Sequence, residues 1–142
     1  MEEQNISIKN INTVAKIFGD KKAEKTLLIL HGWNSNSDRW LEVAEPISKN
    51  GLRVIVPDLP GFGKSSALEN PWNTNQYIDW LEGFIQEMDL KNFYLMGHSF
   101  GGALASKLAV KHAQEVSKLF LVSAACIRKK TTAKKSACSG KT

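Results

Sequence analysis

A serine between two glycines is the residue of this chain best suited to covalent chemistry. It is Ser99, in the segment Gly97-His98-Ser99-Phe100-Gly101, which follows a short apolar run and precedes a helical pattern. In a sharp strand-to-helix turn, small neighbours allow the serine hydroxyl to project above the sheet edge. There the helix dipole and the N–H of Phe100 can stabilise an oxyanion. The pattern predicts that Ser99 is a nucleophile, and a purely structural tight turn is the alternative.

Two earlier segments should lie at the same edge of the sheet. His31-Gly32-Trp33 follows the apolar run 26–30, and Asp58 opens a glycine-rich loop after the apolar run 52–56. The carboxyl ends of parallel strands share one edge, which is where ligands bind in such sheets. The N–H of Trp33 is therefore the predicted second oxyanion donor.

The surrounding pattern predicts an α/β fold with a mainly parallel sheet and an N-terminal antiparallel hairpin. Short extended segments at 6–8 and 14–18 suggest the hairpin. Four apolar strands are then expected at 26–30, 52–56, 93–96 and 118–122, and they alternate with helices. We expect the first helix to be capped by Ser37 or Asp38 and closed by Gly51, the second to be capped by Thr74, and the third to span 100–112. Such alternation implies right-handed crossovers.

Three segments of the chain resemble the α/β-hydrolase fold superfamily, in particular its small-molecule esterases and C–C hydrolases. They are LLILHGW (27–33), RVIVPDLPGFGKS (53–65) and YLMGHSFGGALA (94–105). The resemblance covers about residues 4–125. It implies a serine hydrolase that acts on a small ester, amide or related carbonyl substrate, with a histidine base and an acid that orients it.

The resemblance also assigns roles to individual residues. Ser99 matches the nucleophile, while Trp33 and Phe100 match the oxyanion donors. His31 and Asp58 match positions that normally shape loops through hydrogen bonds. The remaining candidates, expected to line or support the site, are Gly32, Gly97, His98 and Gly101.

The base and the acid of such a triad are not evident in this chain. In the family they follow the serine, but only His112 and Glu115 do so here, at the far end of the predicted helix. Thirteen helical residues place His112 about 20 Å from Ser99, well beyond proton-transfer distance. We expect His112 and Glu115 to be ordinary surface residues. A triad of Ser99, His31 and Asp58 is a less favoured alternative.

The simplest interpretation is a partial α/β-hydrolase domain over residues 1–126, truncated after the fourth strand that follows the hairpin. The missing part would carry the acid and the base. The alternative is a non-catalytic or inactive protein of the same fold. The strand at 118–122 would leave an apolar edge without a neighbour, so we expect poor solubility or partial unfolding.

The composition argues against several other classes of protein. The net charge of +5 arises from six basic residues within 127–142, whereas residues 1–126 carry 13 basic and 14 acidic side chains. We interpret 127–142 as a basic polar tail that is either the start of a lid or a non-native end, and we expect no nucleic-acid binding. Cys126 and Cys138 have no metal-ligand spacing and suggest free thiols in the cytoplasm. No cofactor motif, secretory signal or membrane span is predicted, and the oligomeric state is left open.

The four tryptophans divide into two predicted groups. Trp40 and Trp80 fall on helical faces and should pack in the core. Trp33 comes after the first apolar strand and Trp72 lies in a loop, so we expect both to line a substrate pocket. An apolar pocket of this kind would favour a hydrophobic acyl or aromatic substrate.

Overall fold

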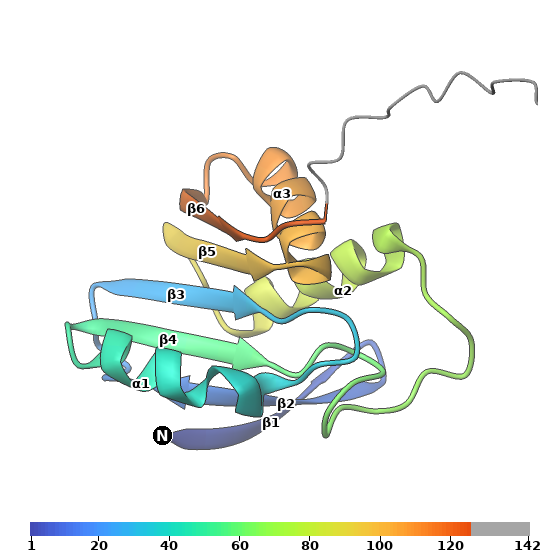
Figure 1. The fold of residues 1–142 in the computed structure, drawn as a ribbon, viewed down its shortest axis with the longest axis horizontal. Coiled ribbons are helices and arrows are strands. Elements are labelled where there is room, and N and C mark those ends of the chain that lie inside the picture. Colours follow the sequence, from blue (N-terminus) through green and yellow to red (C-terminus); the bar gives the residue numbers. More distant parts are fainter. Residues whose placement is uncertain (126–142) are drawn as a thin grey trace, which may run out of the picture.

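The chain forms a single six-stranded sheet with helices on both faces (Figure 1). The computed structural model describes residues 1–125. The strand order is β1-β2-β4-β3-β5-β6, which combines an antiparallel hairpin with parallel strands as the sequence predicts. The predicted tail at 127–142 and both cysteines lie outside the described residues.

The hairpin joins β1 (Glu2–Ile8) to β2 (Ile11–Phe18). Lys9 and Asn10 connect them with φ of 49° and 65°, and two successive residues with positive φ are typical of a type I′ turn. The second strand of the hairpin pairs antiparallel with β4 (Leu52–Pro57), which attaches the hairpin to the rest of the sheet.

The remaining strands are parallel. They are β3 (Lys25–Leu30), β4, β5 (Phe93–His98) and β6 (Val116–Val122), with β3 between β4 and β5. The apolar runs of β3 and β4 are buried on both faces because α1 (Leu41–Ser48) covers one face and α2 (Thr74–Glu87) and α3 (Phe100–Lys111) cover the other (Figure 1). All these strands point the same way, so the loops that follow them gather at one edge.

Two apolar clusters hold the helices to the sheet. The larger cluster joins α2 and α3 to one face and includes Trp80, Phe84 and Leu104. The smaller cluster lies under α1 and includes Ala44 and Ile29. Trp80 is fully buried, as predicted, whereas Trp40 is only half-buried at the margin of the smaller cluster.

Both predicted helix caps were displaced by one residue or more. Asn36, rather than Ser37 or Asp38, accepts the N–H of Asp38 and begins the short 3-10 helix η1 (Ser37–Trp40), from which α1 continues. Asn73, rather than Thr74, caps α2 through a reciprocal pair of hydrogen bonds with Gln76. In both places the capping residue has extended backbone angles, which let its side chain reach the first free N–H groups.

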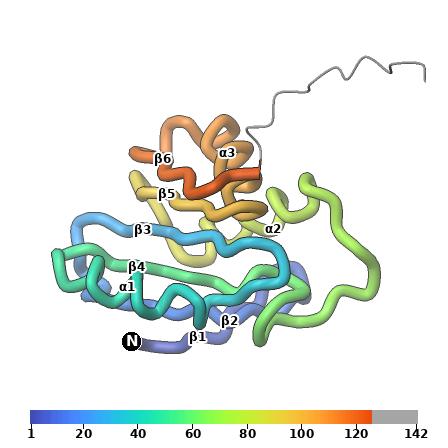
Figure 2. Tube along the Cα trace, viewed as in Figure 1, coloured from blue at the N-terminus to red at the C-terminus, as the bar shows by residue number. Residues whose placement is uncertain are grey.

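The long connection from β4 to α2 follows the edge where the parallel strands end (Figure 2). At the far side of the sheet, β6 pairs only with β5 within residues 1–125. Its residues Leu119 to Val122 are each 38–42% exposed. The apolar edge that the sequence predicts is thus present in the described part of the chain, and its effect on solubility stays a prediction.

Candidate active site

Ser99 lies at the turn between β5 and α3 in a backbone conformation that is unfavourable for residues other than glycine. Its φ is 51° and its ψ is −113°. Backbone hydrogen bonds fix this geometry: the Ser99 N–H donates to Val122 O at 3.1 Å, and the Ser99 carbonyl accepts the N–H groups of Gly102 and Ala125. Strain of this kind persists only where the surroundings enforce it, and it is concentrated at functional sites.

Two glycines allow α3 to begin immediately against the sheet. A Cβ at Gly97 would overlap the backbone of Gly101, and a Cβ at Gly101 would overlap the carbonyl groups of Leu30 and His31. Because these neighbours are backbone atoms, they cannot move aside as a flexible side chain could. The spacing of the glycines around Ser99 therefore has a direct steric cause.

The loop after β3 passes beside this turn. A Cβ at Gly32 would lie 3.2 Å from His98 Nδ1 and 3.5 Å from Ser99 Cβ, so a larger residue in the loop would meet the serine. Within residues 1–125, neither the N–H of Trp33 nor that of Phe100 donates a hydrogen bond, and the Ser99 hydroxyl has no partner. These groups are available to a ligand, and their assignment as oxyanion donors and nucleophile stays a prediction.

A row of aromatic rings lies on the α2 side of Ser99. Trp33, which is 61% exposed, meets Phe62 at 4.9 Å and Phe100 at 5.2 Å between ring centroids. Tyr77 contacts Phe100 at 5.3 Å and Trp72 at 5.3 Å. The sequence analysis did not single out Phe62, although its place in the glycine-rich loop after β4 was a usable signal. The rings form an apolar wall next to the serine.

His31 is fully buried and uses both ring nitrogens in hydrogen bonds. Its Nδ1–H donates to Gly32 O at 2.8 Å, and its Nε2 accepts the N–H of Leu59 at 2.9 Å. Burial lowers the pKa of His31 below its ordinary value, which favours this neutral form. With both nitrogens occupied, His31 has no lone pair to offer to Ser99, so the alternative triad is not formed.

Both carboxylate oxygens of Asp58 also accept hydrogen bonds, in each case from a backbone N–H group. Its carboxylate accepts the N–H of Ser37 at 2.6 Å and the N–H of Lys64 at 2.8 Å. A Cβ at Gly63 would overlap this carboxylate, so glycine lets the loop close around it. Asp58 thereby joins the segments that follow β3 and β4.

A buried lysine that the sequence analysis missed supports the same region. Lys16 on β2 is 3% exposed, and its ammonium group donates to Ser37 Oγ at 3.1 Å and pairs with Asp38. This hydrogen-bonded ion pair holds the pKa of Asp38 below its usual range. A single lysine in an apolar strand pattern was the only signal, because its partners are about twenty residues away.

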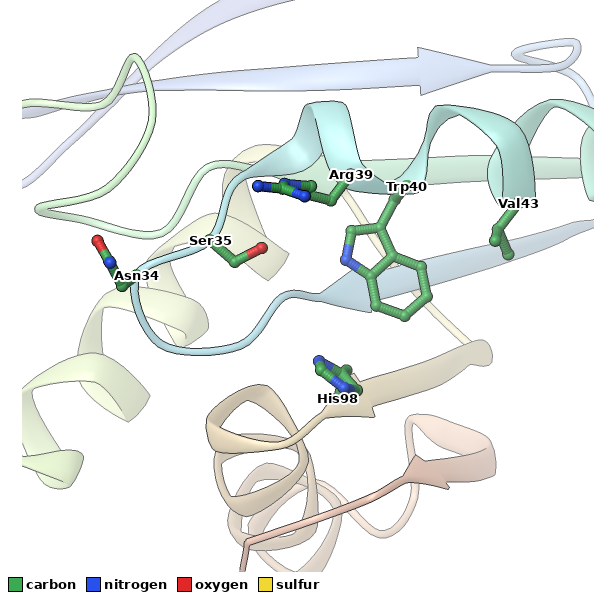
Figure 3. A pocket seen from close by; sticks show the side chains of 6 residues that line it. All are labelled: Asn34, Ser35, Arg39, Trp40, Val43 and His98. Carbon is green, nitrogen blue, oxygen red and sulfur yellow. The ribbon is translucent and has the colours of Figure 1, made fainter.

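His98, which precedes Ser99, faces the opposite side of the sheet from Phe100. Its ring meets that of Trp40 at 6.0 Å, next to a cavity of about 380 Å³ (Figure 3). The side chains that line this cavity are Asn34, Ser35, Arg39, Trp40, Val43 and His98.

The prediction that His112 and Glu115 are ordinary surface residues holds for Glu115, whose side chain is 46% exposed, but not for His112. His112 is half-buried, and its ring contacts Glu82 on α2 at 2.7 Å and Glu115 at 3.2 Å. Lys111 also pairs with Glu82 at 2.8 Å, and with His112 it lowers the pKa of this carboxyl group. The cluster joins α2 to the C-terminal end of α3, away from Ser99. Local sequence patterns did not predict it, because His112 and Glu82 are thirty positions apart in the chain.

Comparison of the sequence with known protein families identifies the family of this chain. The profile of the alpha/beta hydrolase fold matches residues 25–135. The chain belongs to the alpha/beta hydrolase fold family. A 1-acylglycerol-3-phosphate O-acyltransferase of Arabidopsis thaliana is 34% identical over 120 residues, which cover 81% of this chain and 28% of that protein. A probable lysophospholipase of the same plant is 33% identical over 72% of this chain and 23% of its own length.

Solved structures of the family show the same arrangement. A membrane phospholipase A superposes with a TM-score of 0.82 and 29% identity, over 90% of this chain and 42% of that one. The thioesterase domain of a curacin biosynthetic pathway superposes with a TM-score of 0.81 and 31% identity, over 87% of this chain and 46% of that one. This chain thus spans about a quarter of the length of the curated relatives and less than half of these structures.

Two further features of the described residues bear on function. No helix within residues 1–125 has the length and apolar character needed to cross a membrane. The same residues contain no group of three or more histidine, cysteine, aspartate or glutamate side chains placed to hold a metal ion.

Proposed function

We propose that Ser99 is the nucleophile of an acyl hydrolase that acts on a small ester, amide or related carbonyl substrate. The observation that carries this proposal is the strained backbone of Ser99, whose hydroxyl has no partner in residues 1–125 at the start of α3. Such strain has no evident structural benefit, since glycine would adopt the same angles at lower cost.

The reaction begins when Ser99 Oγ attacks the carbonyl carbon of the substrate. The negative charge that develops on the carbonyl oxygen is stabilised by the N–H groups of Trp33 and Phe100 and by the positive end of α3. Collapse of the tetrahedral intermediate expels the alcohol or amine and leaves an acyl group on Ser99, which water then removes.

The proton of Ser99 requires a base that the described contacts do not provide. The chain has three histidines, of which His31 has both nitrogens occupied and His112 pairs with Glu82 on another helix. His98 is adjacent to Ser99, but its ring packs with that of Trp40 and makes no hydrogen bond with the Ser99 hydroxyl within residues 1–125. We therefore assign the nucleophile and the oxyanion donors to residues 1–125, and no general base or acid among those residues.

Because no base within residues 1–125 is in hydrogen-bond contact with Ser99, a second candidate function has support. The chain would then be a non-catalytic or inactive protein of the same fold. The names of the relatives support the hydrolytic candidate, because a lysophospholipase, a phospholipase and a thioesterase all cleave acyl bonds.

Acylation by an activated ester distinguishes the two candidates without requiring full turnover. With 4-nitrophenyl acetate, the parent chain should release about one equivalent of nitrophenolate and carry an acetyl group on the peptide that contains Ser99. Ser99→Ala should lose both signals. Ser123→Ala is a matched control because Ser123 also has positive φ, 46°, at the end of a neighbouring strand. An acetylated Ser99→Ala protein, or a folded parent that never acylates, would favour the non-catalytic candidate.

A further inference from the structure

The two neighbours of Ser99 face different surroundings. Phe100 packs with Trp33 and Tyr77 on the α2 side of the sheet. His98 contacts Trp40 on the α1 side, at the cavity of about 380 Å³. A substrate bound at Ser99 would therefore have aromatic rings on the Phe100 side, and the cavity that His98 lines would lie on the other side, one residue from the serine.

The cavity contains a cation whose charge is not neutralised by another side chain. Arg39 is exposed and forms no ion pair within residues 1–125, and the neighbouring Asp38 is paired with the buried Lys16. Figure 3 shows the Arg39 guanidinium on the same side of the cavity as the Ser35 hydroxyl, while the Trp40 indole extends toward His98. A guanidinium fork matches the geometry of carboxylate and phosphate oxygens.

The rest of the cavity complements such an anion. The Ser35 hydroxyl lies on the Arg39 side, the Asn34 side chain belongs to the lining farther along the loop, and Trp40 and Val43 provide an apolar surface (Figure 3). Glu42, one turn along the chain from Arg39, is not in ion-pair contact with it in the described residues. The cavity therefore combines one free positive charge with hydrogen-bonding groups and an apolar wall.

We propose that this cavity binds an anionic group of the substrate, a carboxylate or a phosphate monoester, through Arg39. The inference rests on the proposed role of Ser99, since it names the class of ester that would acylate it. The preferred substrate is an ester with an apolar acyl part against the aromatic wall and an anionic group a few bonds from the carbonyl.

The test compares short alkyl fluorophosphonates that differ only at the end of the chain. One carries a carboxylate, one its methyl ester, and one a phosphate monoester. In the parent chain the anionic probes should label Ser99 about tenfold faster than the methyl ester at low salt, and this ratio should fall as salt is added. The anion that gives the larger ratio indicates the natural substrate group.

Variants test whether Arg39 causes this preference. Arg39→Met should bring the ratio to about one, and Arg39→Lys should restore part of it. Lys49→Met is the matched control, because it removes one positive charge just after α1 from a side chain that is 72% exposed, and it should keep the ratio. A ratio near one in the parent, or an equal ratio in the parent and in Arg39→Met, overturns the inference.

A binding measurement separates this inference from the proposed function. Ser99→Ala protein is titrated with monomethyl glutarate and with propyl phosphate, and amide resonances of Asn34 and Ser35 are followed by NMR. Saturable shifts that disappear when Arg39→Met is added support the anion site, even if no probe reacts with Ser99 and the proposed function fails. Absence of shifts, or shifts that do not depend on Arg39, overturns the anion site, even if Ser99 is labelled.

Discussion

His31 and Asp58 differ sharply from Ser99, although all three lie at the same edge of the sheet. The two ring nitrogens of His31 and both carboxylate oxygens of Asp58 are hydrogen-bonded and buried. The Ser99 hydroxyl has no partner within residues 1–125, and its backbone is strained. Residue type alone makes all three plausible catalytic groups. The difference in their hydrogen bonds separates the two residues that hold loops together from a serine whose hydroxyl has no partner in residues 1–125.

The largest loss of stability should come from filling the space between the turn at Ser99 and the strand end that carries His31, which Gly101 keeps open. Gly101→Ala places a Cβ on the carbonyl groups of Leu30 and His31, so we expect a loss of about 4 kcal/mol in the free energy of unfolding, or failure to fold. Gly51→Ala is the control, since nothing lies within 4 Å of its Cβ and only its φ of 84° is unfavourable, at about 1 kcal/mol. Urea denaturation measures both, and equal losses would contradict the steric role of Gly101.

Removal of the Asp58 carboxylate tests whether this residue holds the loops after β3 and β4 together. Asp58→Ala leaves the N–H groups of Ser37 and Lys64 without their acceptors, so we expect a loss of about 3 kcal/mol. Asp20→Ala is a suitable comparison, because Asp20 is exposed and its carboxylate accepts only the N–H of Lys22, and the loss of stability should be about 0.5 kcal/mol. Chemical denaturation that finds similar values for both would mean that Asp58 does not hold the loops together.

A pH titration of stability tests the state of His31. Because burial lowers the folded-state pKa of His31 below its ordinary value of 6.5, protonation favours the unfolded chain. The free energy of unfolding should be insensitive to His31 above that value and should decrease as the pH falls below it. The decrease for one proton is limited to about 1.4 kcal/mol per pH unit.

His31→Gln provides the reference for this titration. The variant should be less stable at every pH, but it should lose the His31 contribution to the slope between about pH 6.5 and 5. If the parent and His31→Gln have the same slope in this range, His31 is not held in its neutral form.

The smallest predicted effect concerns the strain at Ser99. Ser99→Gly removes the Cβ from a residue with φ of 51° and ψ of −113°, so it should raise the free energy of unfolding by about 1 kcal/mol. Ser117→Gly in β6 is the control, because the same substitution in a strand without positive φ should lower stability slightly. A destabilised Ser99→Gly protein would indicate that the turn is not strained.

Local sequence patterns were sufficient for most of the fold. The apolar runs predict every parallel strand, and the glycines around Ser99 predict the sharp turn, because each feature depends on residues close together in the chain. The helix caps were misassigned since Asn36 and Ser37, or Asn73 and Thr74, are all chemically able to cap, and only backbone angles decide between them.

The contacts that join distant segments were not predictable in the same way. The pairing of Lys16 with Asp38 and that of His112 with Glu82 depend on how strands and helices pack, and no short pattern encodes them. The same holds for the cavity that Arg39 and His98 both line, since these residues come from different elements of the chain.

The most direct test of the account is phosphonylation of Ser99 by a neutral alkyl fluorophosphonate, followed by the intact mass of the protein. The account predicts a single adduct on the folded parent chain, located on the Ser99 peptide, and no adduct on Ser99→Ala. A folded parent chain that never forms the adduct, or an identical adduct on Ser99→Ala, would contradict the assignment of Ser99 as the nucleophile.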